Sequence, residues 1–451
     1  MRASICLLMA LILAAARPAA AVERETSYVY PPFKHTMGMH RVGQMELKLF
    51  LGPRARIANP QGLAAAKLAI RDDPASDRDD DELTLVGVNS DIGQIVYNPS
   101  LYAVKSLGKV GAGVGEFNRP RGIDINREGD VVVADTGNRR LVLLKLDDKE
   151  LTWSRTIADA GGPFSPTDAK FGQDGIWCTD YASGRILRFD REGRFIGPWP
   201  AAGGLGLEGP LAMALQEAKD EWNQARRFSL LVVDRQGQRV CIFDADGTLR
   251  AERKLDSLIT PPGRFGYPAL DLHGQVVLPD SVFGRIVKLD PRLDLLAIID
   301  HIDDDQEPLD HPNSLALYRR FGQLFIAENK GGTYAWTGTD VKQARVIPQV
   351  QASKPGLMLE YRLTEPSLVS VVLAQAGQEL VVQEQRRRQA GNVADFIELK
   401  PDLPPDAALL IRATPTYSAR KKLVVERRLP IPPGALEALR QGGGGRQGKS
   451  P

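Results

Sequence analysis

Short apolar runs separated by turn residues follow one another between residues 108 and 146. Three of these runs are rich in β-branched side chains, which favours strands: Ile123–Ile125, Val131–Ala134 and Leu141–Leu144. Asp, Asn and Gly fill the two intervening stretches, 128–130 and 135–138, and these residue types are typical of tight turns. The pattern predicts three consecutive strands of one antiparallel sheet, preceded by a Gly-rich loop that ends at Phe117.

The same unit recurs along the chain. A proline that opens the first strand is found six times, with spacings of 60, 46, 44, 58 and 44 residues: Pro60, Pro120, Pro166, Pro210, Pro268 and Pro312. Three of these spacings match the period of about 40 to 45 residues that is typical of propeller blades. The two longer spacings contain charged insertions. We interpret residues 71–82 as a disordered segment or a surface loop, and residues 217–227 as a charged, helix-prone loop.

A second anchor confirms the register of the six copies. An acidic or amide residue opens a turn that leads into the next apolar run, at Asn89, Asp135, Asp180, Asp234, Asp280 and Glu328. Arg follows five residues later in the second to fifth copies, at Arg140, Arg185, Arg239 and Arg285. We expect the acid to cap the turn by accepting backbone N–H groups two residues on, and the Arg head group to reach an acidic partner.

Residues 108–146 resemble an NHL repeat, whose pattern is Gly-x-Gly-x-x-Phe, then Pro-x-Gly, then Val-x-Asp-x-x-Asn-x-Arg-Val. The resemblance implies an all-β fold in which residues 22–350 form a six-bladed β-propeller with four strands in each blade. A propeller has to join its ends or leave a strand edge exposed. Met45–Leu51 alternates apolar and polar residues, and we expect it to supply the outer strand that ties the last blade to the first.

The pattern changes after residue 350. We interpret Lys354-Pro355-Gly356 as a linker, followed by six strand-like runs that predict a small β-sandwich over residues 354–430. Residues 360–377 resemble the opening of the immunoglobulin-like domain of flagellar hook-capping proteins. Residues 431–451 are Gly-rich and basic, which predicts a disordered tail.

The N-terminus has the pattern of a secretory signal peptide. Arg2 precedes an apolar run from Ile5 to Ala16, and small residues follow at 19–21. We therefore expect residues 1–21 to be removed and the protein to be secreted or periplasmic. Two cysteines, Cys178 and Cys241, remain beyond this segment; both lie in strand-like runs and we expect buried free thiols, with a disulfide as the alternative.

Composition changes this picture little. The formal net charge is +2, from 58 basic and 56 acidic residues, so the whole-chain charge gives no reason to expect nucleic acid or an anionic membrane as a partner. With five His and three Cys, a His- or Cys-rich metal centre is not expected. No P-loop, nucleophile elbow, His-Glu-x-x-His or Cys-x-x-Cys motif follows the N-terminal segment.

Two kinds of metal site can be considered at the propeller axis. The gluconolactonase-like propellers bind Ca²⁺ through Glu, Asn and Asp, and the residues just after the anchoring prolines include Asp124, Asp168, Asp271 and Asn313. We name Asp124, Asp168 and Asn313 as the candidate ligands, although the same residue types also cap turns. The amidating lyases use His ligands for zinc on this scaffold, and His273 and His311 are the candidates here, fewer than a zinc site requires.

The sequence thus favours a secreted, non-catalytic binding or scaffolding protein that presents a propeller face to protein, peptide or glycan partners of the cell envelope or exterior. We expect a monomer without a membrane span and without a required cofactor. The alternative is a propeller hydrolase or lyase, lactonase-like or amidating-lyase-like, with a metal in the central channel.

Overall fold

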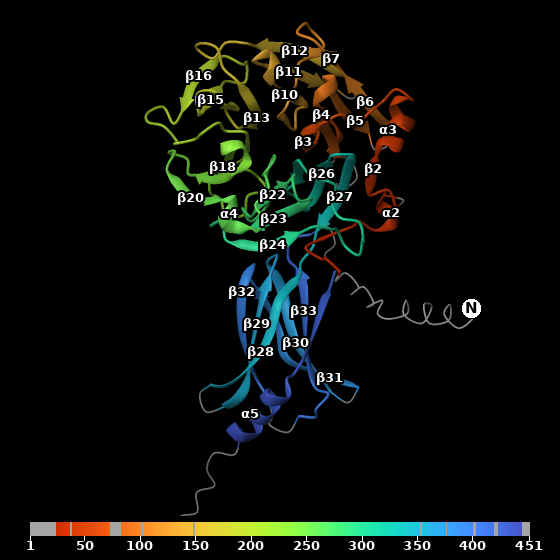
Figure 1. Ribbon diagram of the computed structural model, residues 1–451, viewed down its shortest axis with the longest axis vertical. Coiled ribbons are helices and arrows are strands. Elements are labelled where there is room, and N and C mark those ends of the chain that lie inside the picture. Colours follow the sequence, from red (N-terminus) through yellow and green to blue (C-terminus); the bar gives the residue numbers. More distant parts are fainter. Residues whose placement is uncertain are drawn as a thin grey trace, which may run out of the picture.

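The structure is a computed structural model and forms two lobes (Figure 1). It describes residues 24–36, 38–72, 83–100, 103–147, 149–351, 354–375, 377–399, 403–418 and 423–443. The predicted signal peptide and most of the acidic insertion, residues 73–82, lie outside this described part of the chain.

The larger lobe contains six antiparallel sheets within the described residues, here numbered 1 to 6 in chain order. Sheet 1 contains β3 (Pro60–Lys67), β4 (Leu83–Asn89), β5 (Gln94–Ser100) and β6 (Ala103–Leu107). Sheet 2 contains β9 (Ile123–Ile125), β10 (Asp130–Asp135), β11 (Arg140–Leu146) and β12 (Leu151–Ile157). Sheet 3 contains β13 (Pro166–Gly172), β14 (Gly175–Asp180), β15 (Arg185–Phe189) and β16 (Phe195–Trp199).

Sheets 4 to 6 continue the same order. Sheet 4 contains β17 (Ala212–Gln216), β18 (Ser229–Asp234), β19 (Arg239–Phe243) and β20 (Leu249–Lys254). Sheet 5 contains β21 (Ala269–Leu270), β22 (Val276–Asp280), β23 (Arg285–Leu289) and β24 (Leu295–Ile299). Sheet 6 contains β25 (Ser314–Tyr318), β26 (Gln323–Glu328) and β27 (Gly331–Thr337), joined by β1 (Tyr28–Val29) and β2 (Arg41–Gly43).

The sheets form a closed ring. The first strand of each sheet contacts the first strand of the next, from β3 through β9, β13, β17 and β21 to β25, and β25 contacts β3. The ring is visible in Figure 1 as the red-to-teal circuit of the upper lobe. Sheets arranged radially around a common axis in this way form a β-propeller. All six anchoring prolines lie at the start of a first strand or within three residues of it, as the repeat predicted.

The acidic turns are in the predicted register. Each joins the second and third strands of its sheet. The expected cap, to the N–H two residues on, is found at Asp280, which accepts the Val282 N–H at 3.1 Å, but Asn89, Asp135 and Asp234 make no such side-chain cap. The contact that these side chains share is a different one. Each accepts the backbone N–H of a residue just before the first strand of the same sheet, at 2.7 to 3.3 Å in all six sheets; these donors are Ala58, Asn118, Ser165, Glu208, Arg264 and Asp310. The repeated acid therefore fixes the entry of the chain into each sheet.

The prediction that Met45–Leu51 closes the ring as a strand is wrong. Residues Gln44–Leu51 form helix α3, in which no residue is buried. Met, Leu, Lys and Glu are good helix formers, and the Gly43 N–H donates to the Glu46 carboxylate across the first turn at 2.8 Å. The outer strand of sheet 6 is formed instead by β1 and β2. β1 pairs with the C-terminal part of β27 and β2 with its N-terminal part, and the short helix α2 (Phe33–Thr36) lies between β1 and β2 in the sequence.

The smaller lobe is a β-sandwich. One sheet contains β28 (Val341–Gln351), β29 (Lys354–Leu363) and β32 (Gly391–Glu398). The other contains β31 (Gln378–Arg388), β30 (Ser367–Gln375), β33 (Ala408–Pro415) and β34 (Val425–Pro430). The prediction that Lys354-Pro355-Gly356 is a linker is wrong, because these residues form the start of β29. The partner of β29 is β28, which precedes it, so residues 341–351 already belong to the sandwich and continue its apolar alternation.

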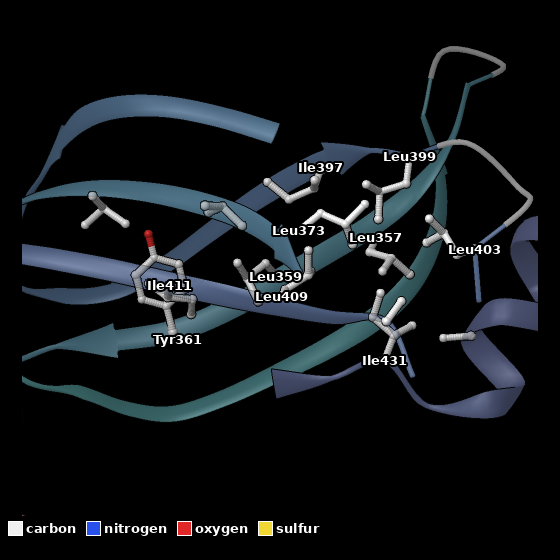
Figure 2. Close-up of a cluster of buried hydrophobic side chains, with 14 of the residues drawn as sticks. Leu357, Leu359, Tyr361, Leu373, Ile397, Leu399, Leu403, Leu409, Ile411 and Ile431 are labelled. Carbon is white, nitrogen blue, oxygen red and sulfur yellow. The ribbon is translucent and has the colours of Figure 1, made fainter. Parts of the chain in front are cut away.

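The core of this lobe lies between the two sheets and includes a helix that the sequence analysis missed. Leu357, Leu359, Leu373 and Ile411 come from both sheets and are at most 3% exposed (Figure 2). Helix α5 (Pro433–Gly443) covers one end of this core with Ala435, Leu436 and Leu439. The prediction of disorder from residue 431 is therefore wrong as far as residue 443, because burial of one apolar helix face outweighs the Gly-rich composition.

The two lobes are joined through side chains as well as through the backbone. Val29 and Trp336 of the propeller pack with Leu423 and Val425 of the sandwich. Lys342 Nζ contacts the Glu25 carboxylate at 2.8 Å, and the Lys288 ammonium forms an ion pair with Glu365. The sandwich is therefore held against sheets 5 and 6 and the N-terminal segment. Cys178 and Cys241 are buried free thiols, as expected.

Candidate ligand-binding pocket

Acidic side chains on the first strands connect neighbouring sheets of the propeller. Asp124 on β9 accepts the N–H of Phe171 on β13 at 2.8 Å, and Asp168 on β13 accepts the N–H of Met213 on β17 at 2.9 Å. The first strand is the inner edge of each sheet, so its outward N–H groups have no partner strand. A short acidic side chain on the preceding sheet satisfies them.

Asp168 is fully enclosed. It has 0% exposed surface, and its second oxygen accepts the Ala169 N–H at 2.9 Å and lies 3.3 Å from Lys170 Nζ. Burial raises the pKa of Asp168 to about 6, against the opposing effect of the Lys170 ammonium. Burial also raises the pKa of Asp124. Sheets 3 and 4 are thus connected by a buried carboxylate whose two oxygens both accept hydrogen bonds.

The third predicted ligand, Asn313, has a separate role. Its amide donates to the Pro60 carbonyl at 2.9 Å and so connects sheet 6 to sheet 1. Within the described residues, no group of three or more His, Cys, Asp and Glu side chains has an arrangement that could hold a metal ion. Asp124, Asp168 and Asn313 each hold a backbone group of a neighbouring sheet, and Ca²⁺ binding by them stays a prediction.

The two histidine candidates lie at opposite ends of the first strands, because His311 precedes β25 and His273 follows β21. His311 is exposed and its Nδ1 lies 3.1 Å from an Asp310 oxygen. Its backbone φ of 53° belongs to a left-handed conformation shared by Asn59 and Arg119, which also precede an anchoring proline. His273 packs edge-on against Tyr417 of the sandwich, and burial, followed by Lys288, lowers its pKa to about 4.

A cavity of about 880 Å³ opens where the first strands end. Its apolar lining comes from the strands themselves and includes Leu63, Ala214, Leu270 and Leu315. Charged and aromatic groups complete it, and those used below are Asp124, Lys170, Glu217, Asp220, Trp222 and Arg319. The lining is more polar than apolar, and a cavity of this size has the dimensions of a small-ligand or side-chain pocket.

Arg319, directly after β25, connects sheets that line this cavity. Its guanidinium donates to the Leu215 carbonyl of sheet 4 at 2.6 Å and to the Leu270 carbonyl of sheet 5 at 3.1 Å. It also lies 3.3 Å from the Asp220 carboxylate. The sequence analysis missed Arg319, because no repeat position marks it; its place directly after the first strand of the sixth copy was the available signal.

The insertion at residues 217–227 contributes to the same cavity. Glu217 accepts the Gln173 N–H, and Asp220 accepts the N–H of Glu217 at 2.8 Å. Burial raises the pKa of Glu217. Lys219 and Glu221 are exposed beside the half-buried Trp222. The insertion, expected as a charged, helix-prone loop, contains turns and no helix, and it forms part of the cavity rim.

Comparisons with known proteins agree with the repeat at one place in the chain. The NHL repeat family model matches residues 117–142, which lie within the segment that defined the repeat above. No curated protein matches. The expectation of an NHL repeat is confirmed for this copy.

Several solved structures are distantly similar. A gluconolactonase from Xanthomonas campestris is 15% identical, with a TM-score of 0.43 over 62% of this chain and 86% of that one. A streptogramin B lyase is 12% identical, with a TM-score of 0.40 over 63% and 95%. Virginiamycin B lyase from Staphylococcus aureus is 15% identical, with a TM-score of 0.37 over 56% and 76%. The propeller assignment itself rests on the closed ring of sheets. No helix among the described residues is long and apolar enough to cross a membrane.

Proposed function

We propose that this chain is an exported binding protein whose propeller pocket holds part of a protein, peptide or glycan partner without catalysing a reaction. One observation carries the proposal: Asp168 on a first strand and Arg319 directly after one are occupied in holding the sheets together. Asp168 is bound on both oxygens, and Arg319 is held by two carbonyls and a carboxylate. Groups engaged in this way position a pocket and are not free to transfer protons.

The proposal includes the finer organisation of the chain. We assign six blades to the six sheets, an immunoglobulin-like character to the sandwich, removal of residues 1–21, and a secreted or periplasmic location. The sequence repeats and the pattern of the N-terminus support these assignments. The unit boundaries that fit the strand pairing best are 24–337 for the propeller and 341–443 for the sandwich.

The pocket suits one end or one side chain of a larger partner. Its volume of about 880 Å³ lies within the range of about 300 to 1,000 Å³ that is usual for ligand sites. Trp222 borders the pocket with the Arg320 guanidinium over its ring, 5.4 Å from the centroid, and Lys219 and Glu221 beside it offer charges of both signs. A stacking surface bordered by hydrogen-bonding groups fits a peptide terminus or a sugar ring.

The test is affinity capture from envelope extract with the full chain and with a Trp222→Ala variant. Trp222 is half-buried at the rim, so its removal should leave the fold intact and weaken capture of the specific partner at least about tenfold. Tyr181→Ala is the matched control, because Tyr181 is an exposed aromatic residue that does not line the pocket. Equal capture by all three proteins would contradict a role for the pocket.

A second candidate, a lactonase-like or lyase-like enzyme, is favoured by Asp124, which lines the cavity with a pKa raised by burial. A carboxyl group with a raised pKa suits proton transfer at neutral pH. Turnover of a lactone or of a hydroxyglycine-extended peptide, abolished by Asp124→Asn or His311→Ala in a folded protein, would replace the binding proposal with this one.

A further inference from the structure

An unusual concentration of exposed apolar side chains lies at the outer rim of the propeller, in residues 38–57, here called the rim segment. Met39, Val42, Met45, Leu49 and Phe50 are all exposed, and Met45 and Leu49 reach 77% and 79% exposure. Helix α3 contributes three of them and buries none of its residues. Single exposed apolar residues are normal on protein surfaces, but five within twelve residues indicate an interaction site.

The rim segment has a defined conformation. Its β2 strand pairs with β27, and the Gln44 side chain holds the stretch after the helix by accepting the Ile57 N–H at 2.9 Å and donating to the Ala55 carbonyl at 2.8 Å. These contacts place Arg54 and Arg56 next to the start of α3. Figure 1 shows α2, β2 and α3 in succession along the outer edge of the ring, with α3 beside β5 and β6 and with β2 beside β27.

The charge of the segment differs from that of the whole chain. Lys48, Arg54 and Arg56 are exposed and pair with no acid among the described residues. The single acid of the segment is Glu46; hydrogen bonds from its own backbone N–H and from the Gly43 N–H lower its pKa, so it stays ionised. Three exposed cations against one ionised acid thus accompany the five exposed apolar side chains. The net charge of +2 conceals this local asymmetry because it averages over 451 residues.

We propose that the rim segment binds the surface of an anionic phospholipid bilayer, with α3 lying in the interface. Apolar side chains flanked by Lys and Arg are the features that drive interfacial binding, through partial insertion and through attraction to anionic lipid. A protein partner fits less well. The segment lies on the outside of a ring, and an eight-residue helix is too small for a stable protein interface of about 1,000 Å².

The test is vesicle co-sedimentation with the chain isolated from the exported fraction of its host, so that any leader has been processed. Vesicles of phosphatidylcholine alone are compared with vesicles of equal parts phosphatidylcholine and phosphatidylglycerol. The protein should bind the second kind, and binding should fall as salt is added, because exposed charges are screened. Met45→Glu with Leu49→Glu should weaken binding by about tenfold or more. Each of Lys48→Gln, Arg54→Gln and Arg56→Gln should weaken it about fivefold.

The matched control is Val110→Glu with Val114→Glu, which adds the same two negative charges at residues of 60% and 78% exposure elsewhere on the surface. It should bind vesicles like the unaltered chain, and circular dichroism should show that all variants are folded. Absence of binding to phosphatidylglycerol vesicles, or equal binding by the Met45/Leu49 variant, would overturn the proposal. A dimer in solution that the Met45/Leu49 variant disrupts, without vesicle binding, would show a second copy to be the occupant and would also overturn it.

Discussion

Asp168 in the propeller and Glu365 in the sandwich are both fully buried carboxylates, yet their surroundings differ. Asp168 accepts two backbone N–H groups and lies beside Lys170, so both of its oxygens are bound. Glu365 pairs with the buried Lys288 through one oxygen, and its other oxygen has no hydrogen-bond partner among the described residues. Burial raises the pKa of Asp168 to about 6 and that of Glu365 to about 8.

The difference comes from how each site is built. In the propeller, the next sheet presents its free backbone N–H groups at a fixed place, so an acid on the preceding strand finds donors. The junction between the lobes has no such repeat. The side chains around Lys288 and Glu365 are those of Asp271, His273, Tyr28 and Tyr417. Each of these four has a buried polar atom without a hydrogen-bond partner among the described residues. Arg319 and Arg387 lie nearby. Repeats satisfy buried charge through the backbone, whereas the junction relies on one cation.

The largest effect is therefore expected for Lys288→Met. The substitution keeps the volume of the side chain but leaves Glu365 and Asp271 buried without their cation. Removing one partner of a buried ion pair typically costs about 3 to 5 kcal/mol. The free energy of unfolding of the full chain, measured by denaturant titration above pH 8, where Glu365 is ionised, should fall by about this amount.

The double variant Lys288→Met with Glu365→Met separates the missing cation from lost packing. Replacing both charges by apolar groups of similar size should restore most of the lost stability. Lys145→Met is the surface control, since Lys145 and Asp130 are 47% and 44% exposed and such pairs contribute less than about 1 kcal/mol. A double variant as unstable as the single one would show that the junction depends on shape, and the comparison with Asp168 would lose its basis.

The second effect is expected for Asp168→Ala, which leaves the N–H groups of Ala169 and Met213 without an acceptor. Each unsatisfied buried donor costs about 1 to 3 kcal/mol, which for two donors gives about 2 to 6 kcal/mol; we expect the lower part of this range, about 2 to 3 kcal/mol, because the variant also removes the buried carboxylate and its desolvation cost. Asp168→Asn retains one acceptor oxygen and should lose about half as much. If Asp168 instead holds a cation, a chelator will lower the melting temperature of the unaltered chain, which our geometry does not require.

The third effect concerns pH. Because burial raises the pKa of Glu365 from 4.5 to about 8, the folded state binds more protons than the unfolded state between these values. The contribution of protonated Glu365 to the free energy of unfolding is fully present below about pH 4.5 and is lost as pH rises through about 8. Glu365→Gln removes this dependence, so the two proteins should diverge by on the order of 1 kcal/mol per pH unit between pH 6.5 and 8.

Titration of His273 changes the stability with pH in the opposite direction to Glu365, and this limits the pH range in which the Glu365 effect can be measured. Burial and the nearby Lys288 and Arg387 lower its pKa from 6.5 to about 4, so stability is lost as pH falls through this range. Asp271, with a pKa raised by burial from 3.8 to about 6, adds to the Glu365 dependence below pH 6. Above pH 6.5, Glu365 is the main contributor of the three. Parallel pH profiles for the Glu365→Gln variant and the unaltered chain would contradict the assignment.

The sequence predicted the repeated part of the molecule well, because its signals are local and recur. The anchoring prolines and the acidic turns lie at equivalent places in all six sheets. The ends of the propeller were harder to predict. Alternation of apolar residues over Met45–Leu51 is compatible with a strand or with an exposed helix, and only a partner strand decides between them. Helix α5 could have been found from the spacing of Ala435, Leu436 and Leu439 after Pro433.

The candidate site was predictable only in its location. Residues after the anchoring prolines do lie around the axis, and Asp124 lines the cavity. Their partners could not be deduced, because Phe171, Met213 and Pro60 are backbone donors and acceptors from other sheets. Arg319 and Trp222 lie outside the repeat pattern altogether. The junction around Lys288 and Glu365 depends on the placement of one lobe on the other, for which a single sequence carries no signal.

The smallest effect is expected at Arg185, and it tests whether the propeller needs cations at all. Arg239 and Arg285 pair with Asp234 and Asp280 of their own turns, with Nε–oxygen distances of 2.8 Å, whereas Arg185 is exposed and pairs with no acid among the described residues. Asp180 of the same turn is nevertheless satisfied, by the Ser165 N–H at 2.8 Å and the Ser183 hydroxyl.

Arg185→Ala should therefore change the free energy of unfolding by less than about 0.5 kcal/mol, as for a surface substitution. Arg239→Ala, which removes a largely buried guanidinium from Asp234, should cost about 2 kcal/mol in the same denaturant titration. The Asp234 carboxylate keeps the Glu208 N–H at 3.0 Å in that variant, so the loss should stay below that of Lys288→Met. A loss at Arg239 as large as at Lys288 would mean that the repeated acids depend on their cations as Glu365 does, and that the backbone donors contribute little.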